Sequence, residues 1–165
     1  MTTDTQPSLY ERLGGRPAIH AFASAALRKG MAHPDIGYIW QHRSEDAFFK
    51  EHAHFVDFLC AAWGGDAVYT GRDMATVHRG MGLTDVHWAA MFDTLEACYI
   101  DFEVPREIAD EINTYFEQFK PVVIGSPDFR EVVLAHPDMD PTQGMKSVGI
   151  HWPKGKSRQA EPASP

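Results

Sequence analysis

The most informative stretch of this chain is Y-T-G-R-D-M-A-T-V-H-R-G-M-G-L, residues 69–83. Its single histidine, His78, lies on a segment too short to be an ordinary helix. The glycines around it are Gly71, Gly80 and Gly82, and the apolar residues beside it at helical spacing are Met74, Val77 and Met81. Neutral imidazole is a common iron ligand, and it needs a rigid mount and an apolar wall around the metal. The stretch is therefore either an iron-binding site or, on residue types alone, a glycine-rich loop that carries a histidine.

Glycine and proline divide the rest of the chain into segments with the apolar spacing of amphipathic helices. The S-x-x-E capping box at residues 8–11 predicts a very short helix that ends at Gly14-Gly15, and Pro17 suits the first turn of a second helix. Further helices are expected from Ser44 to Gly64-Gly65, from Thr84 to Tyr99, from Val104 to a kink or end at Pro121, and over roughly 128–135. No stretch shows sustained period-two alternation, so the predicted class is all-α.

Two apolar stripes predict which helix faces are buried. On the second helix the stripe is Ile19, Phe22, Ala23, Ala26 and Leu27, and on the third it is Phe48, Phe55, Phe58, Leu59 and Ala62. The predicted helical domain spans 1–135. Residues 136–165 are rich in proline and aperiodic, which predicts a mobile tail. The potential metal ligands of that tail are too scattered to predict a site: His136, Met139, Met145 and His151.

Composition narrows the function classes. The 165 residues carry a net charge of −8, which argues against nucleic acid or an anionic membrane as partner, because both demand clustered Lys and Arg. Residues 1–8 show no signal-peptide pattern, and no apolar run is long enough to span a membrane, so a cytoplasmic protein is expected. Cys60 and Cys98 fall within helical patterns and are expected to be reduced core thiols.

The pattern of glycines between the predicted helices resembles that of a known family. L-Y-E-R-L-G-G at 9–15, F-L-C-A-A-W-G-G at 58–65 and Y-T-G-R-D-M-A-T-V-H-R-G-M-G-L-T at 69–84 are similar to the truncated haemoglobins, most closely group I. The resemblance covers about residues 9–124. It implies four main helices packed two-on-two around haem b, with the iron-binding proximal histidine on a nearly dissolved helix.

Carried over position by position, the resemblance places the proximal ligand on His78 and the aromatic against the haem face on Trp40. Tyr69 and Met74 fall on positions at the haem edge and proximal side, and Met91 replaces the tryptophan of groups II and III. The full haem-lining set that it implies is Leu27, Trp40, Phe55, Phe58, Tyr69, Met74, Val77, His78 and Met91. The apolar members would equally suit plain core packing.

The distal side departs from the family pattern. Leu27 stands where the family usually has a tyrosine that donates a hydrogen bond to bound oxygen, and Phe55 stands where a glutamine often supports it. Glu51 lies one turn before Phe55, but a carboxylate donates only when protonated. His54 falls where some cyanobacterial and algal members bind iron as the sixth ligand, so His54 is either that ligand or a haem propionate partner. His52, on the other flank, is a weaker candidate.

The resulting hypothesis is a haem protein that binds diatomic ligands (O2, NO or CO) or exchanges electrons with a reductase. An apolar distal pocket disfavours oxygen storage and tolerates NO binding or redox detoxification better. A nitric oxide dioxygenase or reductase activity is open, and peroxidase-type turnover would need His52 or His54 as distal base. The alternative is a haem-free globin-like sensor or interaction domain. The visible spectrum of the purified protein with added hemin separates these classes.

Overall fold

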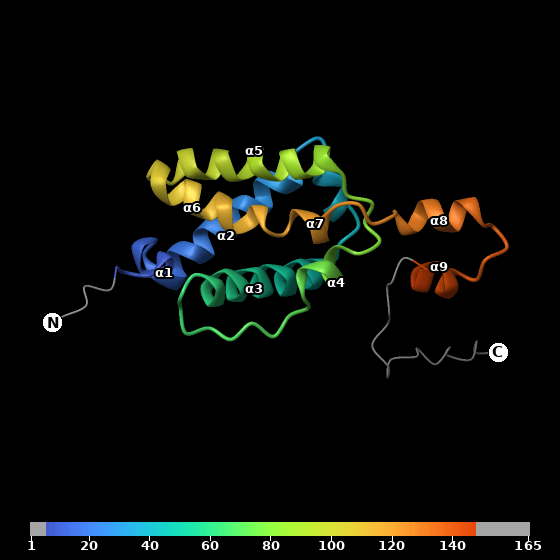
Figure 1. The fold of residues 1–165 in the computed structure, drawn as a ribbon, viewed down its shortest axis with the longest axis horizontal. Coiled ribbons are helices and arrows are strands. Elements are labelled where there is room, and N and C mark those ends of the chain that lie inside the picture. The colour runs from blue at the N-terminus through green and yellow to red at the C-terminus, as the bar shows by residue number, and fades with distance from the viewer. Residues whose placement is uncertain (1–5, 148–165) are drawn as a thin grey trace.

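The computed structural model describes residues 6–147, which are helical and contain no strand (Figure 1). The elements in chain order are α1 (Leu9–Arg12), α2 (Gly15–Ala32), the 3-10 helix η1 (Gly37–Trp40), α3 (Glu45–Ala62), α4 (Met74–His78), α5 (Asp85–Asp101), α6 (Arg106–Glu117), α7 (Lys120–Val123), α8 (Phe129–Ala135) and α9 (Pro141–Ser147). The predicted all-α class is confirmed.

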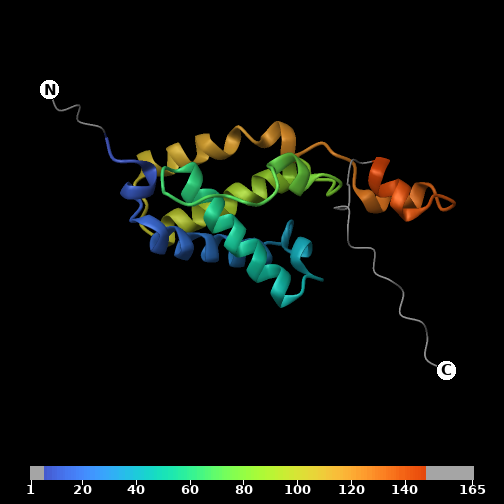
Figure 2. The ribbon, with the colours of Figure 1, turned by 90° about the horizontal axis from the view of Figure 1, so that it is seen from below.

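Four long helices build the body of the molecule. Helix α2 packs against α3 and α5, and α5 packs against α6, so the pairs α2/α3 and α5/α6 form a two-on-two helical sandwich (Figures 1 and 2). The short helix α1 lies on α2 at one end of the body, and α4 lies against α7 at the other. The one-turn helix that carries His78 is therefore held at the end of the sandwich remote from α1.

Local signals set the helix boundaries. The capping box of α1 forms as predicted: the Ser8 hydroxyl accepts from the Glu11 N–H at 3.2 Å, and the Glu11 carboxylate accepts from the Ser8 N–H at 2.8 Å. Ser44 caps α3 by accepting from the Ala47 N–H. Helix α6 ends before Pro121, which lies instead in the first turn of α7, where a missing N–H costs no helical hydrogen bond.

The main core lies between α1, α2, α3, α5 and α6. The predicted stripe of α2 is buried in full. The predicted stripe of α3 is confirmed in part: Leu59 is buried and Phe48, Phe55 and Phe58 are half-buried, whereas Ala62 is exposed. The fully buried residues of this helix are Val56, Leu59 and Cys60. Contact with α2 selects this i, i+3, i+4 set, and the larger Phe55 and Phe58 lie half-buried at its edge.

The chain after α7 continues past the end of the body (Figure 1). Helix α8 occupies the position predicted for the last helical segment, and α9 lies within the segment predicted as an aperiodic tail. Helix α9 packs against α8, and the two project beyond α4 and α7 (Figures 1 and 2). Met145 belongs to α9, whereas His151 lies outside the described residues.

Two further findings concern the described residues 6–147. Cys60 and Cys98 are buried free thiols, as predicted. None of the helices in this range is both long enough and apolar enough to cross a bilayer.

Candidate functional site

Helix α4 is a single turn that mounts His78. Its N-terminus is capped by Asp73, whose carboxylate accepts from the Thr76 N–H at 2.9 Å and the Thr76 hydroxyl at 2.8 Å. At its C-terminal end the backbone leaves the helix at Arg79, and Gly80 and Gly82 follow with φ of +78° and +64°. These left-handed conformations favour glycine, which accounts for two of the glycines beside the histidine.

The imidazole of His78 is oriented by its own helix. Its Nδ1 lies 2.8 Å from the carbonyl oxygen of Met74, and only an N–H at Nδ1 can make this hydrogen bond. The lone pair of the neutral ring is therefore at Nε2, the nitrogen left to bind a metal. Burial lowers the pKa of His78 below its usual value, an effect that the Met74 hydrogen bond and the Glu51 carboxylate oppose. The neutral, ligating form is thus favoured at neutral pH.

Apolar side chains predicted to line the site come from four elements. Met74 and Val77 are half-buried on α4, and Leu27 is buried on α2. Phe55 and Phe58 of α3 and Met91 of α5 are half-buried against the main core, and Met91 also contacts the smaller cluster of Leu83, Trp88 and Val123. An apolar surround of this kind suits a hydrophobic planar cofactor with an imidazole-bound metal.

The predicted site omitted Glu51, a polar group whose charge acts on the histidine. The indole N–H of Trp40 donates to Oε1 of Glu51 at 3.2 Å, and the Arg43 guanidinium lies 2.9 Å from Oε2. Glu51 is half-buried, and its carboxylate is close enough to raise the pKa of His78. The sequence pointed to Glu51 only through its position one turn before Phe55. It gave no indication that Glu51 contacts Trp40 and Arg43.

The two distal histidine candidates separate in the structure. His54 is exposed, and its ring meets the ring of Tyr69 edge-on at 6.3 Å. His52 turns toward α2, where its Nε2 lies 2.8 Å from the Ser24 hydroxyl and its ring is 4.6 Å from that of His20. The hydrogen bond with Ser24 holds His52 against α2, and the role of His54 as sixth ligand stays a prediction.

Tyr69 lies beside His54 and Phe58 of α3. Its ring packs edge-on against Phe58 at 5.3 Å, and its hydroxyl donates to the Arg72 carbonyl at 2.5 Å. Burial raises the pKa of the Tyr69 phenol, so it remains a neutral donor. Its place at the haem edge stays a prediction.

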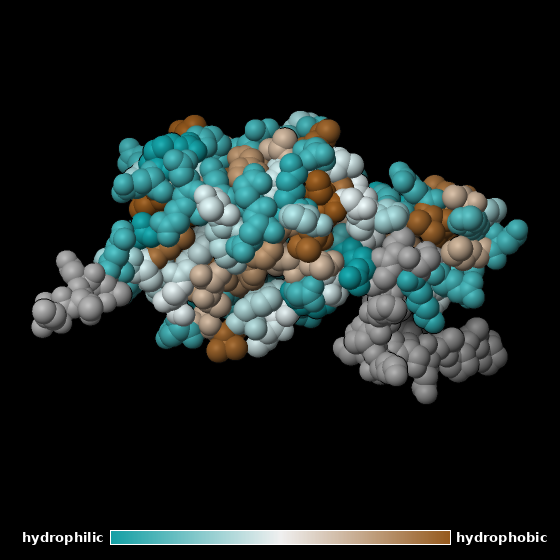
Figure 3. All heavy atoms as spheres, viewed as in Figure 1, coloured by the Kyte–Doolittle hydropathy of each residue, from teal (hydrophilic) through white to brown (hydrophobic). Residues whose placement is uncertain are grey.

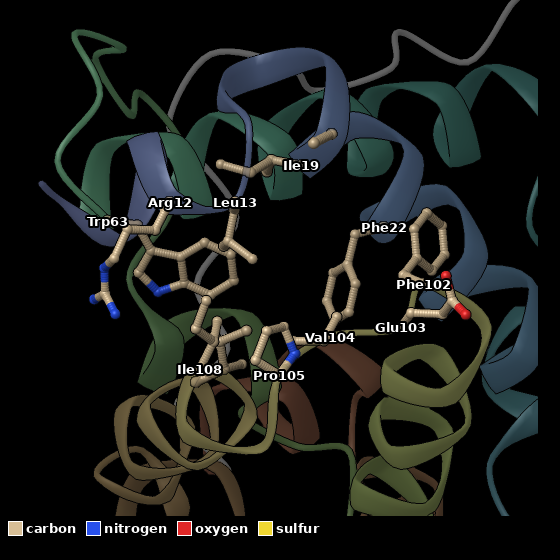
Figure 4. Close-up of a pocket in the computed structure, with 12 residues that line it drawn as sticks. Arg12, Leu13, Ile19, Phe22, Trp63, Phe102, Glu103, Val104, Pro105 and Ile108 are labelled. Carbon is tan, nitrogen blue, oxygen red and sulfur yellow. The ribbon is translucent and has the colours of Figure 1, made fainter.

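A separate cavity of about 190 Å³ lies at the opposite end of the body, between α1, α2, the end of α3 and the α5–α6 turn (Figure 4). Phe22, Ile108 and Trp63 line it, and none of the predicted site residues does. The Trp63 indole N–H is buried there without a hydrogen-bond partner among the described residues. This cavity is distinct from the surroundings of His78.

Comparison with known proteins places the chain in a family. Residues 8–124 match the model of the bacterial-like globins. A group 1 truncated haemoglobin of Tetrahymena thermophila is 28% identical over 120 residues, which cover 73% of this chain and 97% of the relative. One from a Synechocystis species is 27% identical over 131 residues, covering 77% and 97%. The chain belongs to the bacterial-like globin family, as a group 1 truncated haemoglobin.

Solved structures agree. The truncated haemoglobin of Tetrahymena pyriformis in its Fe(III) form superposes with a TM-score of 0.66 at 25% identity, covering 72% of this chain and 99% of that one. The 2/2 haemoglobin of a Synechococcus species, determined in the cyanomet state with covalently attached haem, gives 0.65 at 28% identity, covering 72% and 98%. The cofactor of this family is haem b, and the free Nε2 of His78 within an apolar surround fits it.

Proposed function

We propose that His78 is the proximal ligand of the haem and that the protein binds small diatomic ligands on the opposite side of the ring. The hydrogen bond from His78 Nδ1 to the Met74 carbonyl carries this proposal, because it presents Nε2 as a neutral ligand. When bound, haem would supply an iron centre able to take a diatomic ligand. Leu27, Trp40, Phe55, Phe58, Tyr69, Met74, Val77 and Met91 would form the surrounding wall.

The distal side favours NO and CO over stable oxygen binding. Leu27 is buried and has no donor, and Phe55 occupies the supporting position on α3. Glu51 offers acceptor oxygens and no donor: Oε1 accepts from Trp40, and Oε2 is ion-paired with Arg43. Oxygen as a ligand develops negative charge that a donor stabilises, whereas NO and CO depend less on such a donor. We therefore infer a role in NO binding or redox chemistry rather than oxygen storage.

A matched pair of substitutions tests this inference. Leu27→Tyr adds a phenolic O–H at the buried position, and Leu27→Phe adds the same ring without the hydroxyl. In ferrous protein reconstituted with hemin, Leu27→Tyr should slow oxygen dissociation roughly tenfold to a hundredfold relative to Leu27→Phe, the effect of one strong hydrogen bond. CO dissociation should differ little between the two variants. Slow oxygen release from the native protein would contradict the proposal.

A second candidate is peroxidase-type turnover, which one observation favours. With His52 bound to Ser24, the half-buried Glu51 is the base that the structure offers near the distal side. Its contacts with Trp40 and Arg43 hold the carboxylate in one orientation, as a general base requires. Turnover of hydrogen peroxide that falls in Glu51→Gln and persists in His54→Leu would support this activity. Any redox role also requires an electron donor, such as a reductase.

A further inference from the structure

The chain segment just after the family match contacts the backbone beside the proximal histidine. The match ends at residue 124, and residues 125–129 run antiparallel to residues 80–83. Met81 and Asp128 form a β-bridge, and the Gly125 N–H donates to the Leu83 carbonyl at 3.0 Å. We call residues 125–129 the clasp. It lies outside the part of the chain that the family model describes.

The clasp fixes Gly80 on both sides of its backbone. The Gly80 N–H donates to the Ser126 hydroxyl at 3.1 Å, and the Gly80 carbonyl accepts from the Phe129 N–H at 2.8 Å. The Ser126 hydroxyl also reaches toward the His78 carbonyl, at a long 3.5 Å. Gly80 is buried and lies two residues after the histidine. The clasp therefore fixes the path of the backbone as it leaves α4, because it holds Gly80.

Helix α4 needs such an external hold. One turn of helix fixes several dihedral angles for very few hydrogen bonds, so it is not stable alone. Asp73 holds its beginning and α7 packs on its side. Beyond its C-terminal end, hydrogen bonds from the clasp tie the backbone of Gly80 and Leu83 to another part of the chain.

The clasp packs closely against residues 80–83, the loop that follows α4. A Cβ atom on Gly82 would lie 2.6 Å from Cβ of Asp128, and its φ of +64° already favours glycine. Asp128 is itself fixed, because its carboxylate pairs with Arg130 and accepts from the Arg130 N–H at 2.7 Å. Apolar residues remain visible on the lobe formed by α8 and α9 (Figure 3), and Leu134 is 80% exposed. The clasp contacts the body through its hydrogen bonds, and Arg130 of α8 adds a cation–π contact over the Tyr38 ring at 5.9 Å.

We propose that the clasp is a positioning element for the proximal histidine, with Ser126 as its central positioning residue. It holds Gly80 and so limits how far the His78 imidazole can tilt or withdraw from the iron. This inference rests on the proposed role of His78.

The test compares full-length Ser126→Ala, Ser126→Thr and Gly82→Ala, each loaded with hemin. Thr114→Ala is the control, because that hydroxyl bonds only within its own helix. The first readout is the iron–histidine stretching band of the five-coordinate ferrous species formed just after photolysis of the CO complex. The second is the rate of haem transfer to excess apomyoglobin. Circular dichroism confirms that each variant is folded.

Ser126→Ala and Gly82→Ala should move the iron–histidine band to lower wavenumber and broaden it, whereas Ser126→Thr should restore the native band. Haem loss from Ser126→Ala should accelerate about fivefold, as expected for one lost hydrogen bond. A native band and control-like haem loss in both Ser126→Ala and Gly82→Ala would overturn the clasp while leaving His78 as the ligand. Absence of any iron–histidine band from the native protein would instead overturn the assignment of His78, and the inference with it.

Discussion

The indole nitrogen of Trp40 lies 3.2 Å from Oε1 of Glu51, which joins the 3-10 helix η1 to α3 beside the proposed haem site. Arg43 engages the second carboxylate oxygen at 2.9 Å. These two contacts hold an anionic group close enough to His78 to raise the pKa of its imidazole. The same negative charge should stabilise the more positive ferric state of a haem iron bound by His78.

Glu51→Gln should therefore raise the reduction potential of the haem iron by tens of millivolts. The amide keeps the shape of the side chain and its hydrogen bond with Trp40, and it removes the charge that favours ferric iron. Spectroelectrochemical titration measures the potential. Glu45→Gln, at an exposed position in the first turn of the same helix, is the matched control. An unchanged or lower potential in Glu51→Gln would show that the carboxylate does not act on the iron.

His54 is predicted to reach the iron and give a bis-histidine state when no external ligand is present. Leu27 and Phe55 offer no donor to a competing water or oxygen molecule, and imidazole binds ferric and ferrous iron alike. His54 is exposed beside Tyr69, so the state requires a shift or rotation of α3. His54→Leu should convert a low-spin spectrum to high-spin and abolish saturation of the CO binding rate at high CO. A native protein that is already high-spin would make His54 a propionate partner instead.

A chain that ends at Ala135 should keep the melting temperature and haem spectrum of the full-length protein. It retains the clasp, and the removed helix α9 packs against α8. The segment beyond 136 has the proline-rich composition of a chain with little apolar surface to bury. Thermal unfolding followed at the haem absorption band measures the effect. A large fall in melting temperature would show that the tail docks, with Ile150 and Trp152, outside the described residues, as the first anchors to test.

Stability should fall below neutral pH in part through His52. Burial and the neighbouring His20 lower the pKa of His52 from its usual value near 6.5. The unfolded chain then binds a proton more readily than the folded chain, so acidification through this range favours unfolding. Urea unfolding at pH 7.5 and pH 5.5 should show a smaller loss in His52→Gln than in the native protein. His42→Gln, at an exposed position, should lose as much as the native protein; equal losses in all three would contradict the expectation.

The sequence predicted the helix order and the one-turn helix of His78, because both depend on local chemistry. The capping box of Ser8 and Glu11, the cap at Ser44 and the glycines after His78 each act within a few residues of their position. The buried stripe of α2 follows from helical spacing alone. On α3 the same spacing identified Leu59 and the half-buried Phe55 and Phe58, but it missed Val56 and Cys60, which contact with α2 buries.

The contacts that complete the site are long-range and carry no periodic signal. Ser126 meets Gly80 across 46 residues of sequence, and nothing in a proline-flanked serine predicts that partner. The sequence placed Glu51 on the correct helix, but the orientation of its carboxylate depends on Trp40 and Arg43. Trp40 ends η1, and Arg43 lies in the irregular connection that follows. Such contacts form only when the tertiary fold brings the segments together.

The visible absorption spectrum of His78→Gly, titrated with hemin without and with added imidazole, tests the central claim most directly. His42→Gly serves as the control for loss of an exposed imidazole. If His78 is the proximal ligand, the native protein and the control bind one haem with a histidine-ligated spectrum, whereas His78→Gly binds haem weakly until free imidazole restores the native bands. A His78→Gly protein with unchanged haem content and an unchanged ferrous spectrum would contradict the account.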